Sequence, residues 1–160
     1  GGAGTCGDGV VDPGEACDDG NATPRDGCDG CVFDCLEAGG QLLPPSGHCY
    51  LVRDVKATWF EASNVCHKYG GTLAVINGDD ELAAVASLIT DHWVGLRDAN
   101  QDGAFEWVTG EPLWLGPTTL DLPWKTGHPK AGEHCAKLKS SELESKQCLS
   151  DHGKLACEIP

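Results

Sequence analysis

Ten cysteines in a chain of 160 residues constrain what this protein can fold into more than any other feature. An even number of cysteines at this density is typical of disulfide-linked proteins made in an oxidising compartment. The alternative is a zinc site, for which Cys28 and Cys31 have a suitable Cys-x-x-Cys spacing. No second such pair follows at zinc-ribbon spacing, so the sequence favours disulfides and predicts a secreted or cell-surface protein.

Acidic side chains are concentrated at the N-terminal end. The formal net charge is −14, and the first 37 residues contribute −8 of it, because they contain nine acids and a single base, Arg25. A surface this acidic repels phosphate backbones, which excludes nucleic acid as a natural partner. Acids clustered with cysteines indicate either a calcium-binding segment or a well-solvated surface. The sequence has no apolar run long enough to cross a bilayer, so we expect no membrane insertion.

The chain divides into two parts of different character. Residues 6–35 hold five cysteines and almost no aliphatic side chains, so cross-links or metal must supply the order that a core would give. We therefore expect an acidic cysteine-rich repeat at 1–35, a linker at 36–42 and a globular domain at 43–160. The repeat is also the more suitable place for calcium, with these candidate ligands: Asp12, Glu15, Asp18, Asp19, Asn21 and Asp26.

Local patterns in the larger part predict two helices. Thr58 and Glu61 form a capping box, and apolar side chains then recur at helical spacing until Gly70-Gly71. Asp79 is a suitable cap for a second helix. Short strand-like segments lie at 72–76, 93–96, 105–108, 135–138 and 154–158. The stretch 110–132 is rich in proline and glycine, and loops of this length in compact domains are usually functional.

The order of motifs from residue 48 onward resembles the C-type lectin-like domain. The matching segments are His48-Cys49-Tyr50, Ala62 to Cys66, Gly71-Thr72-Leu73-Ala74, Trp93-Val94-Gly95-Leu96, Phe105-Glu106-Trp107, Gly132-Glu133-His134-Cys135, Cys148 and Ala156-Cys157-Glu158. The resemblance implies an α+β fold with a double loop, two helices and short antiparallel strands. It also implies three disulfides: Cys66 with Cys157, Cys135 with Cys148, and Cys35 with Cys49.

The N-terminal part resembles a second family, the acidic cysteine-rich repeat of pappalysins and many bacterial surface proteins. The matching segments are Cys6-Gly7-Asp8-Gly9, Pro13 to Asn21, and Asp26-Gly27-Cys28. With Cys35 assigned to the domain, Cys6, Cys17, Cys28 and Cys31 remain, and the sequence leaves all three of their pairings open.

The family's sugar site is a calcium ion in the long-loop region, held by five side-chain oxygens, and this sequence departs from it. His128-Pro129-Lys130 replaces the Glu-Pro-Asn element, and Leu143-Glu144-Ser145 replaces the Trp-Asn-Asp element. Only Glu133 remains in place, with Glu144 as a substitute. The ammonium of Lys130 would stand near the cation and repel it. We therefore predict a degraded sugar and calcium motif.

Two further metal hypotheses concern the domain. Asp98 and Asp102 match half of the family's auxiliary calcium site, although a polar turn before Phe105 accounts for them equally well. Two histidines and two acids surround the vacated sugar site and would suit zinc, or they are ordinary loop residues: His128, Glu133, His134 and Glu144.

Three functions remain open. The first is a non-catalytic extracellular module that recognises a protein or glycan through its long-loop face. Its candidate contacts are Trp114, Trp124, His128, Lys130, Glu133 and Glu144. The second is a calcium-dependent carbohydrate-binding lectin with a rearranged site, and the third is a structural spacer that presents a neighbouring domain. We expect no enzyme, because the sequence has no nucleophile elbow, zincin helix or phosphate loop.

Overall fold

This computed structural model describes residues 5–113 and 121–160, so the candidate contact Trp114 lies outside the described residues. The elements in chain order are β1 (Cys28–Asp29), β2 (Val32–Phe33), β3 (Gln41–Leu42), β4 (Cys49–Ala57), α1 (Trp59–Lys68), β5 (Thr72–Leu73), α2 (Asp79–Leu88), β6 (His92–Arg97), β7 (Glu106–Trp107), β8 (Cys135–Lys139), β9 (Glu142–Lys146) and β10 (Gly153–Ile159). The fold is α+β, as the sequence predicts.

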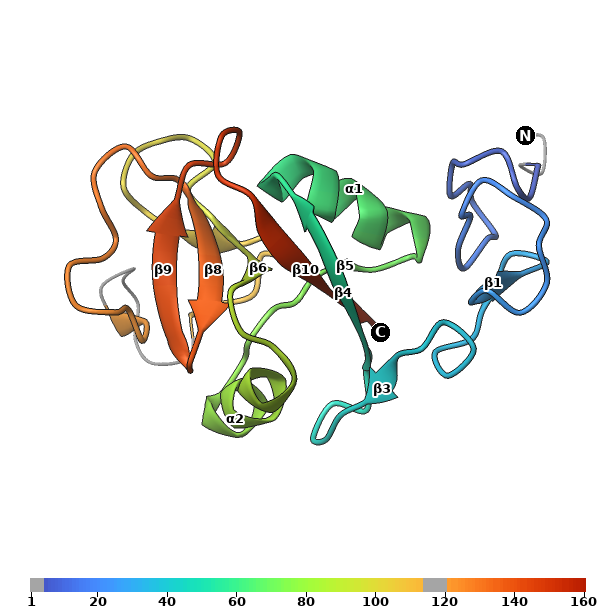
Figure 1. The fold of residues 1–160 in the computed structure, drawn as a ribbon, viewed down its shortest axis with the longest axis horizontal. Coiled ribbons are helices and arrows are strands. Elements are labelled where there is room, and N and C mark those ends of the chain that lie inside the picture. Colours follow the sequence, from blue (N-terminus) through green and yellow to red (C-terminus); the bar gives the residue numbers. More distant parts are fainter. Residues whose placement is uncertain (1–4, 114–120) are drawn as a thin grey trace.

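The strand β10 organises the main sheet, whose strand order is β3-β4-β10-β6-β8-β9 (Figure 1). It pairs with β4 antiparallel, with Cys157 opposite Leu51, and with β6 parallel. We predicted antiparallel strands throughout, so the parallel pair is a difference. It arises because β6 and β10 are joined through the long-loop region, and a long connection lets two strands run in the same direction.

The two helices lie on different sides of these strands, α1 above and α2 below in Figure 1. The predicted capping box of α1 is present: Glu61 N donates to Thr58 Oγ1 at 3.4 Å, and Thr58 N donates to the Glu61 carboxylate at 2.8 Å. The buried face of α1 consists of Trp59, Ala62 and Cys66. Burying this face contributes most of the helix's stability, because ten residues are too few for a stable isolated helix.

The predicted cap of α2 is one residue off. Gly78 occupies the N-cap position and Asp79 is the first helical residue. The backbone N–H of Asn77 instead donates to the Glu81 carboxylate at 2.7 Å. The other Glu81 oxygen accepts a 2.6 Å hydrogen bond from the Tyr50 hydroxyl, and burial raises the pKa of that phenol. Glu81 therefore ties the start of α2 to the sheet.

Five disulfides use all ten cysteines. The bridges Cys66–Cys157, Cys135–Cys148 and Cys35–Cys49 are the three pairs that the resemblance implies. In the repeat the pairs are Cys6–Cys31 and Cys17–Cys28, which selects one of the three open pairings. Because Cys28 and Cys31 are both in disulfides, their thiolates are not available to zinc.

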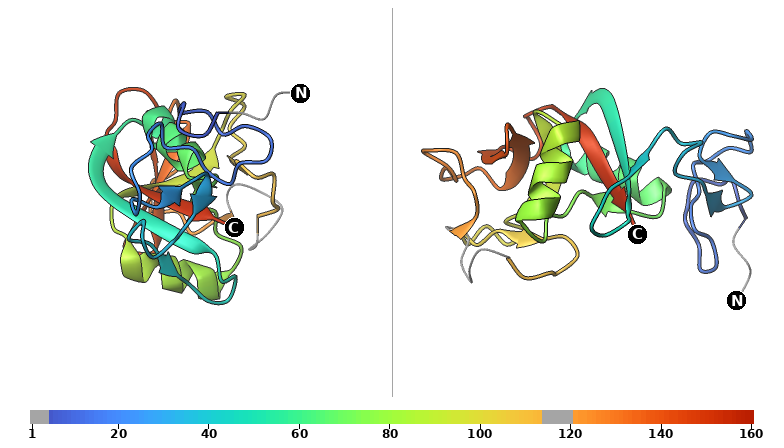
Figure 2. Two further views of the ribbon diagram at one scale, coloured as in Figure 1. Left: turned by 90° about the vertical axis from the view of Figure 1, so that its right-hand side faces the viewer. Right: turned by 90° about the horizontal axis from the view of Figure 1, so that it is seen from below.

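The N-terminal repeat packs against the end of α1 (Figure 2). Asp18 N donates to the Lys68 carbonyl at 2.8 Å, which satisfies one of the carbonyls left open at the helix end. The Phe33 ring meets Tyr69 edge-on, with 6.1 Å between centroids. A Cβ at Gly70 would collide with the Ala16 carbonyl, so the close approach of the two backbones requires glycine there.

Candidate functional site

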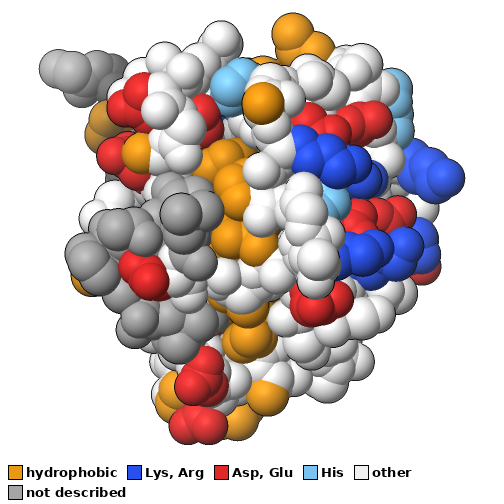
Figure 3. Space-filling view, turned by 90° about the vertical axis from the view of Figure 1, so that its left-hand side faces the viewer, with side chains coloured by type: hydrophobic (Ala, Val, Ile, Leu, Met, Phe, Trp, Pro, Cys, Tyr) orange, Lys and Arg blue, Asp and Glu red, His pale blue; other side chains and the backbone are white. Residues whose placement is uncertain are grey.

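The long-loop face is built on the outer edge of β9, the last strand in the order of the main sheet. Leu143 N donates to the Pro123 carbonyl at 2.8 Å, and Lys125 N donates to the Leu143 carbonyl at 2.9 Å. The segment 123–125 therefore covers the middle of the strand edge, which would otherwise be free to pair with another chain. Figure 3 shows basic and acidic side chains interleaved on one half of this face and a strip of apolar side chains through its middle.

Trp124, a candidate ligand contact, supports the loop from beneath. Its ring lies 5.0 Å from the Phe105 ring in an edge-on arrangement, and its partly buried side chain packs on the core that includes Leu122 and Leu143. Aromatic pairs of this geometry stabilise a fold beyond the area that they bury. Trp124 thus holds the loop on the sheet and exposes only part of its ring.

Ser145 is the centre of a hydrogen-bonded cluster in the region where the sequence predicts a degraded sugar motif. Its hydroxyl donates to Glu133 at 2.7 Å and accepts from Lys130 N at 2.8 Å. Its backbone N–H donates to His128 Nδ1 at 3.0 Å, so this ring is neutral with its proton on Nε2. Burial lowers the pKa of His128, and the charge of Lys130 lowers it further. Each member of the cluster is therefore satisfied by another member.

Glu144 is neutralised by two lysines. Lys125 Nζ lies 2.7 Å from one carboxylate oxygen, and Lys146 Nζ lies 3.3 Å from the other. The hydrogen bond from Lys125 lowers the pKa of Glu144 to about 2, against the opposing effect of burial, and Lys146 adds to the lowering. The carboxylate is charged at neutral pH, and its charge is already balanced.

These residues do not fit a calcium ion. Calcium takes six to eight oxygen ligands, and clustered carboxylates usually supply its charge. Here Glu133 accepts from Ser145, and two ammonium groups meet Glu144 where a cation would have to stand. The sequence assigned the repulsive charge to Lys130. The ion pairs of the structure involve Lys125 and Lys146 instead, while Lys130 contributes its backbone N–H.

The auxiliary site is occupied by the protein's own donors. The buried Asp98 carboxylate accepts from Asp102 N at 3.1 Å, from Gly103 N at 3.0 Å and from His134 Nδ1 at 2.9 Å. Burial raises the pKa of Asp98, but these three hydrogen bonds outweigh it and lower the pKa overall. The sequence offered a polar turn as the alternative to calcium here, and these contacts support that interpretation. They also separate His134 from His128, so the two histidines of the zinc hypothesis have different partners.

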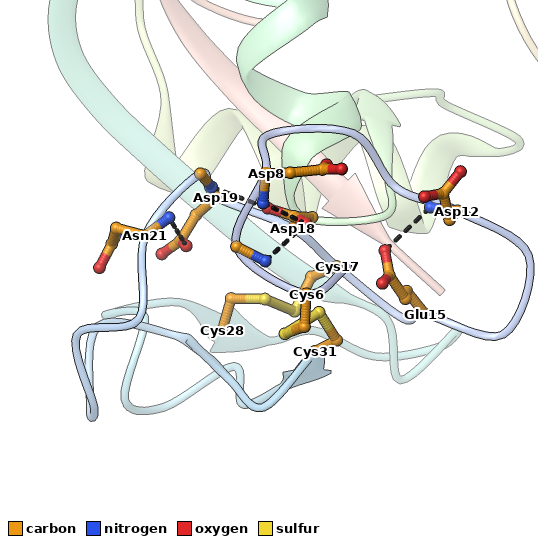
Figure 4. Close-up of a disulfide and its surroundings, with 12 residues drawn as sticks. Cys6, Asp8, Asp12, Glu15, Cys17, Asp18, Asp19, Asn21, Cys28 and Cys31 are labelled. Atoms are coloured by element: carbon orange, nitrogen blue, oxygen red, sulfur yellow. Dashed lines mark hydrogen bonds between the residues drawn. A yellow bond between two sulfur atoms is a disulfide. The ribbon is translucent and has the colours of Figure 1, made fainter. Parts of the chain in front are cut away.

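In the N-terminal repeat, Asp18 acts as the structural centre (Figure 4). One carboxylate oxygen accepts from Gly7 N at 2.8 Å and Asp8 N at 3.1 Å, and the other accepts from Gly9 N at 2.9 Å and Gly20 N at 2.8 Å. Burial raises the pKa of Asp18, but the four amides outweigh it and lower the pKa. With four hydrogen bonds on two oxygens, Asp18 orders a loop that has no apolar core.

The other acids of the repeat are spread around Asp18. Figure 4 shows Asp12 and Glu15 on one side of it and Asp19 and Asn21 on the other. Among the described residues, the metal-type cluster is Glu15, Asp18 and Cys31. Cys31 is in a disulfide and the oxygens of Asp18 already hold amides, so this cluster does not fit a metal ion.

The family model of the Lectin C-type domain matches residues 55–159. The chain belongs to this family. A relative of this C-type lectin domain, C-type lectin domain family 4 member M of Nomascus concolor, is 29% identical over 112 residues, which are 66% of this chain and 27% of the relative. The chain thus spans about a quarter of the length of such curated relatives.

Solved structures agree with this assignment. The carbohydrate-recognition domain of the mouse scavenger receptor C-type lectin superimposes with a TM-score of 0.61 at 25% identity, over 69% of this chain and 88% of that one. Human lithostathine gives 0.66 at 23% identity, over 76% and 96%, which shows the fold alone. Residues 4–32 match a domain of unknown function, DUF4215. No described helix of this C-type lectin domain protein is long and apolar enough to cross a membrane.

Sequence reasoning missed the two lysines that pair with Glu144 in this C-type lectin domain, Lys125 and Lys146. Lys146 had a detectable signal, because it follows Glu144 by two residues and the two share one face if the segment is a strand. Lys125 had none, since it is separated from Glu144 by 19 positions and reaches it only through the loop.

Proposed function

We propose that the protein is a non-catalytic extracellular module that binds a protein or glycan ligand through its long-loop face without calcium. The pairing of Glu144 with Lys125 and Lys146 carries this proposal, because these ammonium groups do electrostatically what a bound cation would do. The cluster around Ser145 supports it, since Glu133 is satisfied there by a neutral hydroxyl.

The side chains available to a ligand differ from the candidate set that the sequence suggests. Lys125 keeps 49% of its side chain exposed and Lys130 is exposed, whereas His128 exposes only 7% and Glu144 8%. Direct contacts therefore come from lysines and from the accessible part of Glu133, with His128 and Glu144 fixing their positions. Such a polar face suits hydrogen bonding to sugar hydroxyls or to a polar protein surface.

A glycan array and a cell-surface binding assay, each with calcium and with EDTA, test the proposal. We expect binding that EDTA does not change and that Lys130→Glu abolishes. The matched control is Lys139→Glu, an exposed lysine in β8 outside the Ser145 cluster. Binding that disappears with EDTA would instead establish the calcium-dependent lectin with a rearranged site. Binding that neither lysine variant affects would place the ligand contact away from Lys130 and contradict the proposed face, and absence of any binding would leave the spacer function.

We also propose that calcium binds to the N-terminal repeat of this protein rather than to its lectin domain. Asp19, Asn21 and Asp26 support this. Burial raises the pKa of Asp26, and hydrogen bonds from the Asn21 side chain, the Cys28 N–H at 3.4 Å and the Asp19 side chain outweigh this effect and lower the pKa. Asn21 N also donates to the Asp19 carboxylate at 3.2 Å, which places this carboxylate in the same turn. Calorimetry on the full chain should show calcium uptake that Asp26→Asn removes and the control Glu37→Gln preserves. Uptake that Asp26→Asn leaves unchanged would contradict this assignment.

A secreted or cell-surface location follows from the disulfides, because five bridges persist only in an oxidising compartment. The proposed division is an acidic repeat at 1–35, a linker at 36–42 and a C-type lectin domain at 43–160. Limited proteolysis with mass spectrometry tests it. Resistance to cleavage throughout 36–42 would favour one continuous unit. The hydrogen bond that Arg53 donates to the Ala38 carbonyl at 2.7 Å already ties this segment to the domain. Within that division, the kinship of the repeat with pappalysin repeats stays a prediction.

A further inference from the structure

A cleft of about 800 Å³ is lined by residues of both the N-terminal repeat and the lectin domain. The repeat lies at the end of the molecule opposite to β8 and β9 (Figures 1 and 2). Gly9 and Val11 of the repeat form one side. The end of α1, the segment 70–72 and Val75 contribute the opposite side. The volume is that of a pocket for a small organic ligand, and such pockets are commonly found between domains.

Hydrogen bonds fix the repeat against the end of α1, so the repeat can form one side of this cleft. Gly9 N donates to the Asp18 carboxylate, and Asp18 N donates in turn to the Lys68 carbonyl at the end of α1. The required glycine at position 70 brings the two backbones together beside these contacts. Because both walls are tied to the same helix end, the cleft has a defined width before a ligand arrives.

A buried acid forms part of the cleft lining. Glu158 is 7% exposed, and burial raises the pKa of its carboxyl group. One oxygen lies 2.7 Å from His48 Nδ1, and the other accepts from Val75 N at 2.8 Å. Each carboxylate oxygen can accept two hydrogen bonds, so both retain an acceptor position for a ligand. A second acid, Glu111, lies in the lining and is exposed.

We propose that this cleft binds a small apolar molecule that carries one primary ammonium group. The apolar part would lie against Val11 and Val75, and the ammonium would donate to Glu158, with Glu111 adding attraction. The charge of the surroundings favours a cation, since the protein carries −14 overall and its first 37 residues carry −8. Among the described residues, three basic side chains line the cleft. His67 and Lys68 are exposed, where water and salt screen them, and His48 already contacts one oxygen of Glu158, which leaves the other oxygen to the ammonium.

The test uses 4-phenylbutylamine as the probe, titrated into the full chain and followed by NMR. The same titration with 4-phenylbutanol and 4-phenylbutyrate measures the contribution of charge on an unchanged apolar skeleton. We expect the amine to bind about tenfold more tightly than the alcohol, which corresponds to about 1.4 kcal/mol, and the carboxylate to bind most weakly. Equal affinity for amine and alcohol would overturn the assigned ligand class.

Two substitutions test whether the probe binds in the cleft. Val11→Arg brings a positive charge to the lining and should weaken amine binding at least tenfold. Val32→Arg makes the same change at an exposed position of the repeat that does not line the cleft, and it should have no effect. Equal effects of the two variants would place the binding elsewhere and contradict the proposal.

Glu158→Gln supplies the second measurement. It should weaken binding of the amine and leave binding of the alcohol unchanged. Glu111→Gln, at an exposed position, should also weaken amine binding, but less than Glu158→Gln does. If Glu158→Gln unfolds the domain, Glu111→Gln still allows amine and alcohol binding to be compared. If neither substitution discriminates amine from alcohol, the ammonium is not recognised here. All of these outcomes are independent of ligand binding at the long-loop face.

Discussion

The Ser145 hydroxyl lies 2.7 Å from a carboxylate oxygen of Glu133 and donates a hydrogen bond to it. The acid that a calcium-dependent relative would offer to a cation is thus satisfied by a neutral neighbour from the next strand. Because Ser145 is fully buried, the hydrogen bond is protected from water and the arrangement is closed without metal.

Removing the two lysines and adding a carboxylate should create calcium dependence. In Lys125→Gln/Lys146→Gln/Ser145→Asp, three carboxylates lie together without a counterion, so the melting temperature in EDTA should fall. Calcium at a hundredfold excess over its dissociation constant should then stabilise the variant by about 2.7 kcal/mol. The double lysine variant without Ser145→Asp is the control in thermal melts. A triple variant whose melting temperature is the same in EDTA and in calcium would contradict this account.

Asp18→Asn should loosen the whole N-terminal repeat. An amide side chain has one acceptor oxygen, and its NH₂ group would face backbone N–H groups that now find a carboxylate. Hydrogen exchange at Gly7, Gly9 and Gly20 should accelerate by about tenfold or more, while the lectin domain keeps its protection. Asp29→Asn, at an exposed position, is the matched control. Unchanged exchange in the Asp18 variant would show that the disulfides alone order the loop.

The stability of the protein should fall as the pH decreases below about 6.5, partly because of His92. Burial lowers the pKa of this histidine in the folded state and outweighs the hydrogen bond with the Thr90 backbone and the charges of Asp54 and Asp91, which raise it. The unfolded chain therefore takes up its proton at a higher pH than the folded chain does. Stability from this group is complete above the unfolded pKa and is lost as the pH falls toward the folded pKa.

His92→Gln should flatten that part of the pH dependence in urea unfolding curves. The control His152→Gln alters an exposed histidine and should leave the slope unchanged. An identical slope in wild type and His92→Gln would show that this imidazole does not carry the effect.

Two disulfides of the lectin domain that close loops of very different length should differ in their contribution to stability. Cys66–Cys157 joins residues 91 positions apart, and Cys135–Cys148 joins residues 13 apart. In the chain-entropy model, removing the first as a double alanine variant should cost about 4–5 kcal/mol and removing the second about 3 kcal/mol. Denaturant unfolding measures both. A larger loss from the shorter loop would show that native-state strain or packing, rather than loop entropy, determines the contribution.

Local patterns in the sequence were sufficient for the parts of the fold that local interactions specify. The capping box and apolar spacing of α1 involve residues within a few positions of each other, so the helix could be predicted. The strand β9 was missed because Glu142–Lys146 is dominated by charged residues, and strands are usually recognised by apolar or alternating patterns. It forms a strand because β8 pairs with it and the segment 123–125 covers its other edge.

For the candidate site, too, some features could be predicted from the sequence and others depended on the tertiary structure. The sequence alone predicts which ligands a calcium site would lack, because residue identity at positions 128, 130 and 145 decides whether a carboxylate or amide oxygen is present. Only the tertiary structure decided which basic side chains pair with Glu144. Lys125 reaches Glu144 across a long loop, and the repeat closes a cleft against α1. Both depend on the three-dimensional path of the chain, which places residues in contact regardless of their separation in sequence.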